Sequence, residues 1–396
     1  MPIDVERARR DTAGCTNVTH LNNAGSALPP RQVVDAVVHH LRLEEEGGGY
    51  EAALAETDRI EHVYDALARL IGAGPHEIAL QENATRAWDM AFHGLRWQPG
   101  DRILTGRSEY ASNAIAYLQT ARRYGVRVEV VPDDEHGQIS VPALRELIDE
   151  RVKLIGVTHV PTQGGLVNPA AEIGEVARAA GVRYLLDACQ SVGQLPLDVR
   201  EIGCDLLTAP GRKYLRGPRG TGFLYCSERL LESLEPPFLD LQSAVWTGPD
   251  SYRVRDDARR FESWENGVAG RIGLGVAVDY ALDLGLPAIE QRITELAEGL
   301  RERLRALPGV RMHDRGVRQC GIVSLTVDGH DSPDLLRELR AQRINLSVST
   351  VGQARWDLAE RGLESVLRAS VHYYNTEQEL DRLCAALPAP RPTGLG

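Results

Sequence analysis

Lys213 is the first residue whose type suggests chemistry, because Lys153 is the only other lysine among 396 residues. The many arginines of the chain stay protonated and cannot attack a carbonyl, whereas a lysine amine can form a Schiff base with an aldehyde once its pKa falls. Lys213 follows the apolar run 205–209 and precedes the glycine-rich turn 217–220. We therefore expect it at a strand end, where it can reach a cleft; a surface lysine on a hairpin is the alternative interpretation.

Two further polar sites follow apolar strands. Asp187 closes the apolar run 183–186, and a carboxylate is costly to bury there without a cationic partner. That partner is either a cationic ligand or a structural arginine. The turn 81–86 joins a short strand to a helix, so the N–H groups of Ala84 and Thr85 can bind a phosphate or simply belong to an ordinary helix cap.

The spacing of apolar residues predicts an α/β protein. Short apolar strands alternate with helices over 102–188, which is typical of a mainly parallel sheet covered on both faces. Ligands bind such sheets at the carboxyl ends of the strands, where Asp187 and Lys213 are expected. Beyond Val254 the pattern changes to a smaller α+β region. We expect an N-terminal arm at 1–30, a large domain at 31–255, a small C-terminal domain at 256–388 and a flexible tail at 389–396.

Two individual elements are expected to be continuous. Apolar residues at helical spacing predict one helix over about 52–71. An alternating run predicts one strand over 344–349.

Composition narrows the class of function. The net charge of −11 argues against a main role in binding nucleic acid or anionic membranes. The chain shows neither a membrane-spanning apolar run nor a signal-peptide pattern, so we expect a cytoplasmic protein. The six cysteines form no C-x-x-C pair and the histidines no H-E-x-x-H spacing. Reduced thiols and no metal site are therefore expected.

The three features together predict a pyridoxal 5'-phosphate (PLP) site. The phosphate of PLP needs N–H donors, its pyridine nitrogen needs a carboxylate, and its aldehyde needs a lysine. The helix start at Ala84, the strand-end acid Asp187 and the rare Lys213 supply these parts in one α/β sheet. Each feature is weak alone, and their combination is much stronger.

Two motifs also resemble a known family. Residues 186–198, LDACQSVGQLPLD, and residues 211–225, GRKYLRGPRGTGFLY, look like the core motifs of class V aminotransferase-fold PLP enzymes, the superfamily of cysteine desulfurases and C–S lyases. Similar segments extend the resemblance over almost the whole chain. It implies PLP fold type I, with a large and a smaller domain, and a PLP-dependent enzyme that acts on a small amino acid as a homodimer.

The resemblance also implies a role for each matching residue. Lys213 would hold the PLP aldehyde and later move the Cα proton, and Asp187 would pair with the pyridine nitrogen. Tyr110 would stack on the cofactor ring, which a tyrosine face can do. Arg368 would grip the α-carboxylate of the substrate with two hydrogen bonds. The other implied cofactor contacts are Ala84, Thr85, Thr162, Gln190, Arg212 and, from the second subunit, Asn266, and the other implied substrate contacts are Asn23, Ala24 and Gly25.

The departures from the family pattern suggest a reaction. Cysteine desulfurases of the family carry a loop cysteine that takes up sulfur, and the matching segment 347–356 has none. Residues 211–220, 345–349 and 371–375 look most like the branch with the ergothioneine-pathway C–S lyase and the related lincosamide-pathway enzymes. We therefore expect β-elimination from an S-substituted L-cysteine conjugate, which would release a thiol, pyruvate and ammonia.

The same scaffold can host other reactions. An aminotransferase is the first alternative, and oxidative or decarboxylating deamination of a cysteine conjugate is the second. A non-catalytic PLP-fold protein that senses a ligand is a third. It is disfavoured because Lys213, Asp187 and Arg368 are all present.

Overall fold

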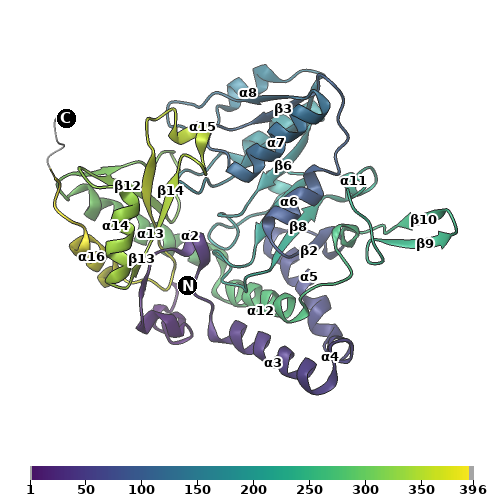
Figure 1. The fold of residues 1–396 in the computed structure, drawn as a ribbon, viewed down its shortest axis with the longest axis horizontal. Helices are drawn as coiled ribbons and strands as arrows, with labels where there is room; N and C mark the ends of the chain where they lie inside the picture. Colours follow the sequence, from purple (N-terminus) through teal and green to yellow (C-terminus); the bar gives the residue numbers. More distant parts are fainter. Residues whose placement is uncertain (1, 392–396) are drawn as a thin grey trace.

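A seven-stranded sheet forms the centre of the computed structural model, which describes residues 2–391 (Figure 1). Its strand order is β2-β8-β7-β6-β5-β3-β4, and only β8 runs antiparallel to its neighbours. This confirms the expected mainly parallel sheet. The strands are β2 (Ile78–Gln81), β3 (Arg102–Thr105), β4 (Arg127–Val130), β5 (Val152–Thr158), β6 (Arg183–Asp187), β7 (Leu206–Pro210) and β8 (Gly222–Cys226).

Helices cover both faces of this sheet. They are α5 (Thr57–Ile71), α6 (Ala84–Phe92), α7 (Ala111–Tyr124), α8 (Val141–Leu147), α9 (Ala170–Ala180), α10 (Val199–Ile202) and α11 (Glu228–Leu231). Leu185 of β6 belongs to the same apolar cluster as Tyr117 of α7. The next residue, Leu186, lies in the opposite cluster with Ile173 of α9. Successive strand side chains point to opposite faces, so a continuous apolar strand is buried on both.

A four-stranded antiparallel sheet organises the small domain. Its order is β11-β12-β15-β14, with β11 (Val310–Met312), β12 (Ile322–Val327), β15 (Ser365–Ser370) and β14 (Ser347–Thr350). Four helices accompany it: α13 (Leu286–Arg305), α14 (Ser332–Ala341), α15 (Arg355–Leu358) and α16 (Glu377–Ala386). The two domains lie side by side, with the small one on the left of Figure 1.

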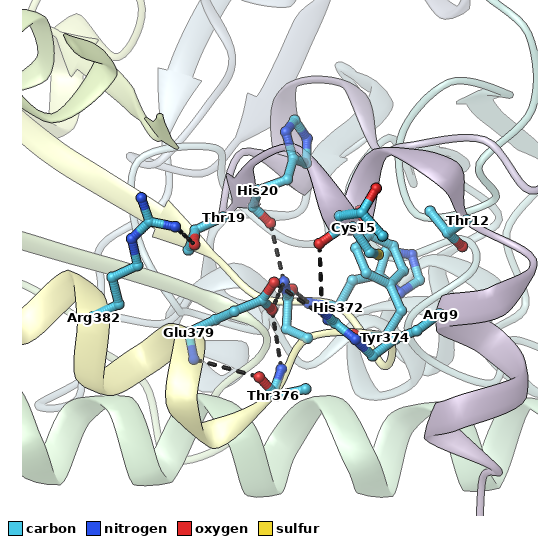
Figure 2. A network of polar contacts seen from close by, with 12 residues as sticks. Arg9, Thr12, Cys15, Thr19, His20, His372, Tyr374, Thr376, Glu379 and Arg382 are labelled. Atoms are coloured by element: carbon cyan, nitrogen blue, oxygen red, sulfur yellow. Dashed lines mark hydrogen bonds and ion pairs between the residues drawn. The ribbon is translucent and has the colours of Figure 1, made fainter. Parts of the chain in front are cut away.

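The N-terminal arm crosses to the small domain. It contains α1 (Val5–Arg10), a 3₁₀ turn η1 (Ala13–Thr16), β1 (Thr19–His20) and α2 (Asn23–Ser26), and β1 pairs in parallel with β13 (Ile344–Asn345). Figure 2 shows the polar network that fixes it. The Glu379 carboxylate accepts from Arg9 at 3.2 Å and from the Asn375 side chain at 2.9 Å. The Arg382 guanidinium donates to the Thr19 hydroxyl at 3.1 Å, so α16 holds both parts of the arm.

The remaining elements lie around the large domain. They are α3 (Arg31–Gly47), α4 (Gly49–Ala55), the hairpin β9 (Ala244–Gly248) and β10 (Ser251–Val254), α12 (Val268–Leu284), and 3₁₀ turns η2 (Pro75–Glu77) and η3 (Ala258–Phe261). α12 packs on α3 and α5 of the large domain. The expected domain boundary at 255/256 stays a prediction. Within residues 2–391, no single helix is long and apolar enough to span a membrane, and α12 and α13 meet that test only as a pair bent by 80°.

The structure corrects two expected elements. The helix expected at 52–71 is interrupted at Glu56, where the Thr57 hydroxyl donates to the Leu54 carbonyl at 2.7 Å and competes with the backbone ladder. The strand expected at 344–349 is divided, because β13 pairs with β1 whereas β14 pairs with β15. A local pattern does not show which strand will be the partner. From residue 392 onward, the expected tail lies outside the described residues.

A buried ion pair joins the small domain to the loop that follows β5. The Arg301 guanidinium donates to the Asp314 carboxylate at 2.7 Å and to the Ile322 carbonyl at 2.8 Å. Asp314 also accepts from the Ser324 hydroxyl at 2.8 Å and from the Gly165 backbone N–H at 3.3 Å. This single carboxylate therefore ties residues of both domains together.

Replacing Arg301 by methionine is expected to lower the free energy of unfolding by about 3–5 kcal/mol, because it leaves a buried carboxylate without its cation. The two side chains are 2% and 3% exposed. Arg303→Met on the same helix is the control, since its pair with Asp381 is 34% and 64% exposed. That exposed pair should contribute at most about 1 kcal/mol. Denaturant unfolding compares the variants, and equal losses would contradict the prediction.

Candidate active site at the carboxyl edge of the sheet

A cavity of about 450 Å³ opens at the carboxyl ends of the parallel strands. Its walls come from the segments that follow β2, β3, β5, β6 and β7, and strand register brings them together: Thr158 pairs with Asp187, and Asp187 pairs with Thr208. Ligands of α/β sheets bind at this edge. Of the residues expected at the cofactor, eight line the cavity: Ala84, Thr85, Tyr110, Thr162, Asp187, Gln190, Arg212 and Lys213.

Asp187 is a buried carboxylate that lacks a cationic protein partner. It is 4% exposed and accepts hydrogen bonds from the Cys189 backbone N–H and the Asn113 side chain, both at 2.9 Å. A second buried acid, Glu109, lies close by and also accepts from Asn113, at 3.0 Å. Among residues 2–391, no lysine, arginine or histidine forms an ion pair with either acid. A cationic ligand group therefore fits this end of the cavity, and the alternative of a structural arginine does not apply.

Lys213 presents its amine to the same cavity. Burial is the largest influence and lowers the pKa of Lys213, and the neighbouring Arg212 and Arg368 guanidiniums act in the same direction. Asp187 and Cys189 oppose this shift in part. A lowered pKa increases the fraction of neutral amine, the form that attacks an aldehyde. The other lysine, Lys153, lies near the opposite end of β5 and donates to the Glu150 carbonyl at 2.8 Å.

The start of α6 forms another wall. The Asn83 side chain caps the helix by accepting from the Arg86 N–H at 2.9 Å, and Ala84 and Thr85 line the cavity. The helix and its cap approach β8 closely: a Cβ at Gly222 would lie 3.0 Å from the Ala84 nitrogen. Glycine at position 222 thus allows this approach, and the positive end of the helix faces the cavity, as an anion such as a phosphate requires.

Arg368 is a buried cation without an acidic partner. It is 5% exposed and donates to the Thr162 carbonyl at 3.0 Å and to the Asn22 side chain at 3.3 Å. Its Nε has no partner among residues 2–391, and burial lowers the pKa of Arg368 to about 10. Thr162 lines the cavity, so Arg368 lies directly behind the wall. A carboxylate would satisfy both its charge and its free N–H.

Two residues of the arm contact the site through backbone carbonyls. The Ala24 carbonyl accepts from the Gln190 side chain at 3.0 Å, and the Gly25 carbonyl accepts from Arg212. The Oε1 atom of Gln190 is buried and has no partner within residues 2–391, so it is free to accept from a ligand. The arm therefore closes one side of the cavity.

Two expected residues lie elsewhere. Asn23 is fully buried and its side chain donates to the Ser370 carbonyl at 2.7 Å, so it holds the arm to β15 instead of facing the cavity. Asn266 lines a separate hollow near the end of α3 with Tyr50 and Trp264, and its expected contact with the cofactor of a second subunit stays a prediction. Neither position belongs to the cavity of its own chain.

Sequence reasoning missed Glu109, Asn113 and Cys189. Glu109 and Asn113 are an acid and an amide four residues apart at a helix start. This spacing could have indicated that the two side chains contact each other. Cys189 lines the cavity, and burial, followed by the Asp187 charge, raises the pKa of its thiol. The thiol is therefore protonated near neutral pH. No group of three or more His, Cys, Asp or Glu residues in 2–391 is arranged to hold a metal ion.

Comparisons with known proteins agree with this geometry. The model of the family "Aminotransferase class-V" matches residues 19–383. A probable cysteine desulfurase of Methanothermobacter thermautotrophicus is 32% identical over 384 residues, with 96% of each chain covered. The apo structure of a cysteine desulfurase from Thermococcus onnurineus NA1 superposes with a TM-score of 0.90 at 26% identity over 97% of each chain. A C-DES mutant with glycine covalently linked to its PLP cofactor gives a TM-score of 0.86 at 26% identity, covering 95% of this chain and 98% of that one.

These relatives correct the expected reaction. A C–S lyase acting on cysteine conjugates was expected from the missing cysteine in 347–356, and this expectation was wrong: relatives over the whole length are named cysteine desulfurases. A difference confined to one loop carries less weight than similarity along the whole chain. The residues of the cavity fit PLP, because an acid without a cation, an amine of lowered pKa and a free helix N-terminus meet there. The chain is a PLP-dependent enzyme of fold type I and belongs to the class V aminotransferase family.

Proposed function

We propose that this enzyme removes the sulfur atom of L-cysteine and leaves alanine. The observation that carries the proposal is the full-length similarity, 32% identity over 96% of both chains, to a probable cysteine desulfurase. The cavity offers what an amino acid bound to PLP needs, namely an amine at Lys213, an acid at Asp187 and a guanidinium at Arg368. The likeness of residues 345–349 and 371–375 to the ergothioneine and lincosamide branch stays a prediction.

PLP, when bound, withdraws electrons from the bonds at the substrate Cα. In the proposed roles, Lys213 holds the cofactor aldehyde and afterwards moves the proton at Cα. Asp187 keeps a proton on the pyridine nitrogen, and Tyr110 stacks on the ring. The N–H groups of Ala84 and Thr85 bind the phosphate, with the Arg212 guanidinium nearby.

Arg368 is proposed to orient the substrate. Its buried guanidinium binds the α-carboxylate, and Thr162 and Asn22 hold the guanidinium in place. In the proposed role, the Gln190 side-chain N–H, which donates to the Ala24 carbonyl at 3.0 Å, donates to the cofactor ring oxygen. Arg368 would thus fix the substrate carboxylate, and Gln190 would fix the cofactor. The proposed reaction therefore depends on groups from the arm, the large domain and the small domain together.

We also propose a homodimer. Large apolar side chains on α3, α4 and the nearby loops are exposed, among them Tyr50 at 75%, Leu54 at 78% and Trp264 at 53%. Exposed apolar area of this kind is typical of protein interfaces. Asn266 lies in the hollow between these residues, where it can reach the cavity of a second copy but not its own.

The products of the reaction test the proposed function. Purified enzyme loaded with PLP is expected to convert L-cysteine to alanine and sulfide in equal amounts. Dithiothreitol is added because residues 347–356 contain no cysteine. One of its thiols takes the sulfur as a persulfide, and its second thiol then displaces sulfide, which oxidises the dithiol to its cyclic disulfide. Amino-acid analysis, a sulfide assay and a pyruvate assay follow the products. Pyruvate and ammonia in place of alanine would contradict desulfuration and indicate β-elimination.

Replacing Lys213 by alanine is expected to abolish the covalent, borohydride-trappable attachment of PLP, because Lys213 is the only lysine among the described residues that line the cavity. Peptide mass spectrometry after reduction measures it. Lys153→Ala is the matched control, since Lys153 contacts only the Glu150 carbonyl near the other end of β5 and should leave the attachment unchanged. A trapped adduct on Lys153 in the Lys213→Ala protein would exclude the proposed role.

Replacing Arg368 by lysine is expected to reduce kcat/KM for cysteine about 10- to 100-fold, mainly through KM. A hydrogen bond between charged groups contributes about 1.5–3 kcal/mol, and lysine cannot form the two-pronged contact. Steady-state kinetics measures the change, with exposed Arg337→Lys as the control. A fall in kcat at unchanged KM would show that Arg368 does not bind the substrate.

A further inference from the structure

The second buried acid, Glu109, lies behind Asp187 and belongs to none of the roles above. It stands between β3 and α7 and is 3% exposed. Its carboxylate accepts from the Thr105 hydroxyl at 2.8 Å, the Tyr110 backbone N–H at 2.8 Å and the Asn113 side chain at 3.0 Å, and also from the Thr158 hydroxyl. Four donors from three segments therefore converge on a group that does not line the cavity.

Asn113 joins this acid to Asp187. Its Nδ2 donates to Glu109 Oε1 at 3.0 Å and to Asp187 Oδ2 at 2.9 Å. Both hydrogens of one amide are thus used, and a flipped amide would turn its oxygen toward two acceptors. The two carboxylates therefore fix the orientation of Asn113, and Asn113 fixes the hydrogen bond that Asp187 receives.

The cationic Lys213 interacts with Asp187, whereas the charge that acts on Glu109 is the negative charge of Asp187. Burial is the main cause that raises the pKa of Glu109 to about 7, and the Asp187 charge adds to it, while the hydrogen bonds from Thr158, Asn113 and Thr105 oppose it. The other titratable group facing Glu109 is Tyr117 of α7, whose phenol pKa is raised by burial and by both acids. A cation bound at Asp187 would favour the ionised form of Glu109.

We propose that Glu109 is a positioning residue for the cofactor: through Asn113, it sets the orientation and negative potential that Asp187 presents to the pyridine nitrogen of PLP. A protonated pyridine nitrogen and an ionised Glu109 stabilise each other. The coupling is reciprocal, so an ionised Glu109 strengthens PLP binding as much as bound PLP favours its ionisation. The proposal rests on the cofactor and does not depend on the proposed desulfuration.

The sign of the pH dependence follows from this coupling. Because the pKa of Glu109 is raised to about 7 without a ligand, the acid is largely neutral well below that pH and ionised well above it. The contribution of its charge to PLP affinity is therefore absent at low pH and grows as the pH rises through this value. A variant without the charge should lose only the high-pH part of the affinity.

Glu109→Gln tests the charge while it keeps the shape. The glutamine oxygen can accept from Tyr110, Asn113 and Thr158, and its amide can donate to the Thr105 hydroxyl. Fluorescence titration of the unloaded protein with PLP is expected to show about 3- to 10-fold weaker binding above pH 8 and little change below pH 6. The pH midpoint of the visible absorption of the bound cofactor should fall by about half to one unit, as expected for charges about 10 Å apart.

Two further variants separate positioning from structure. Exposed Glu146→Gln should leave both the affinity and the midpoint unchanged. Asn113→Ala removes the bridge, and adding it to Glu109→Gln should change the midpoint by less than the sum of the single effects. Equal loss of affinity at every pH, or an unmoved midpoint with a stably folded Glu109→Gln protein, would overturn the proposal. Loss of desulfuration alone would bear on the proposed function instead.

Discussion

Buried negative charge without a protein cation is the constraint on which this structure depends. Asp187 and Glu109 are 4% and 3% exposed and lie at the carboxyl ends of parallel strands. Such a pair is costly in a protein interior unless hydrogen bonds or a bound cation compensate it. Backbone and side-chain donors supply part of the compensation, and in the proposed site the pyridine nitrogen of PLP would supply the cation.

Two basic residues, Lys213 and Arg368, lie around Asp187, and the fold sets where each of them stands. Lys213 follows β7, next to β6, whereas Arg368 lies on β15 of the small domain and contacts Thr162 of the large one. The buried pair of Arg301 and Asp314 anchors the loop after β5 to the small domain. An amino acid held between these cations would have its carboxylate fixed by one domain and its reacting carbon by the other. The contacts between the two domains that close the site would therefore also align the substrate.

Local patterns predicted much of the site and less of the reaction. Apolar runs located the ends of β6 and β7, so Asp187 and Lys213 were placed correctly at the cavity. Asn266 lines a separate hollow, and its expected contact with the cofactor of a second subunit stays a prediction. The expected lyase reaction was wrong because it relied on one loop without a cysteine, residues 347–356, and on the likeness of a few short segments to one branch of the family. Similarity to the cysteine desulfurases extends along the whole chain, and the absence of one loop cysteine does not outweigh it.

The sequence by itself determined where β6 and β7 end, that a helix begins near Ala84, and that Lys213 is one of only two lysines. These features follow from local periodicity and residue type, which act over a few positions. Only the tertiary structure decided that Asn113 would bridge Glu109 to Asp187, 74 residues away, and that β13 and β14 would pair with different strands. Such contacts depend on strand order and register. These are set when segments that are distant in the chain bury their apolar side chains against one another, and no local pattern contains that information.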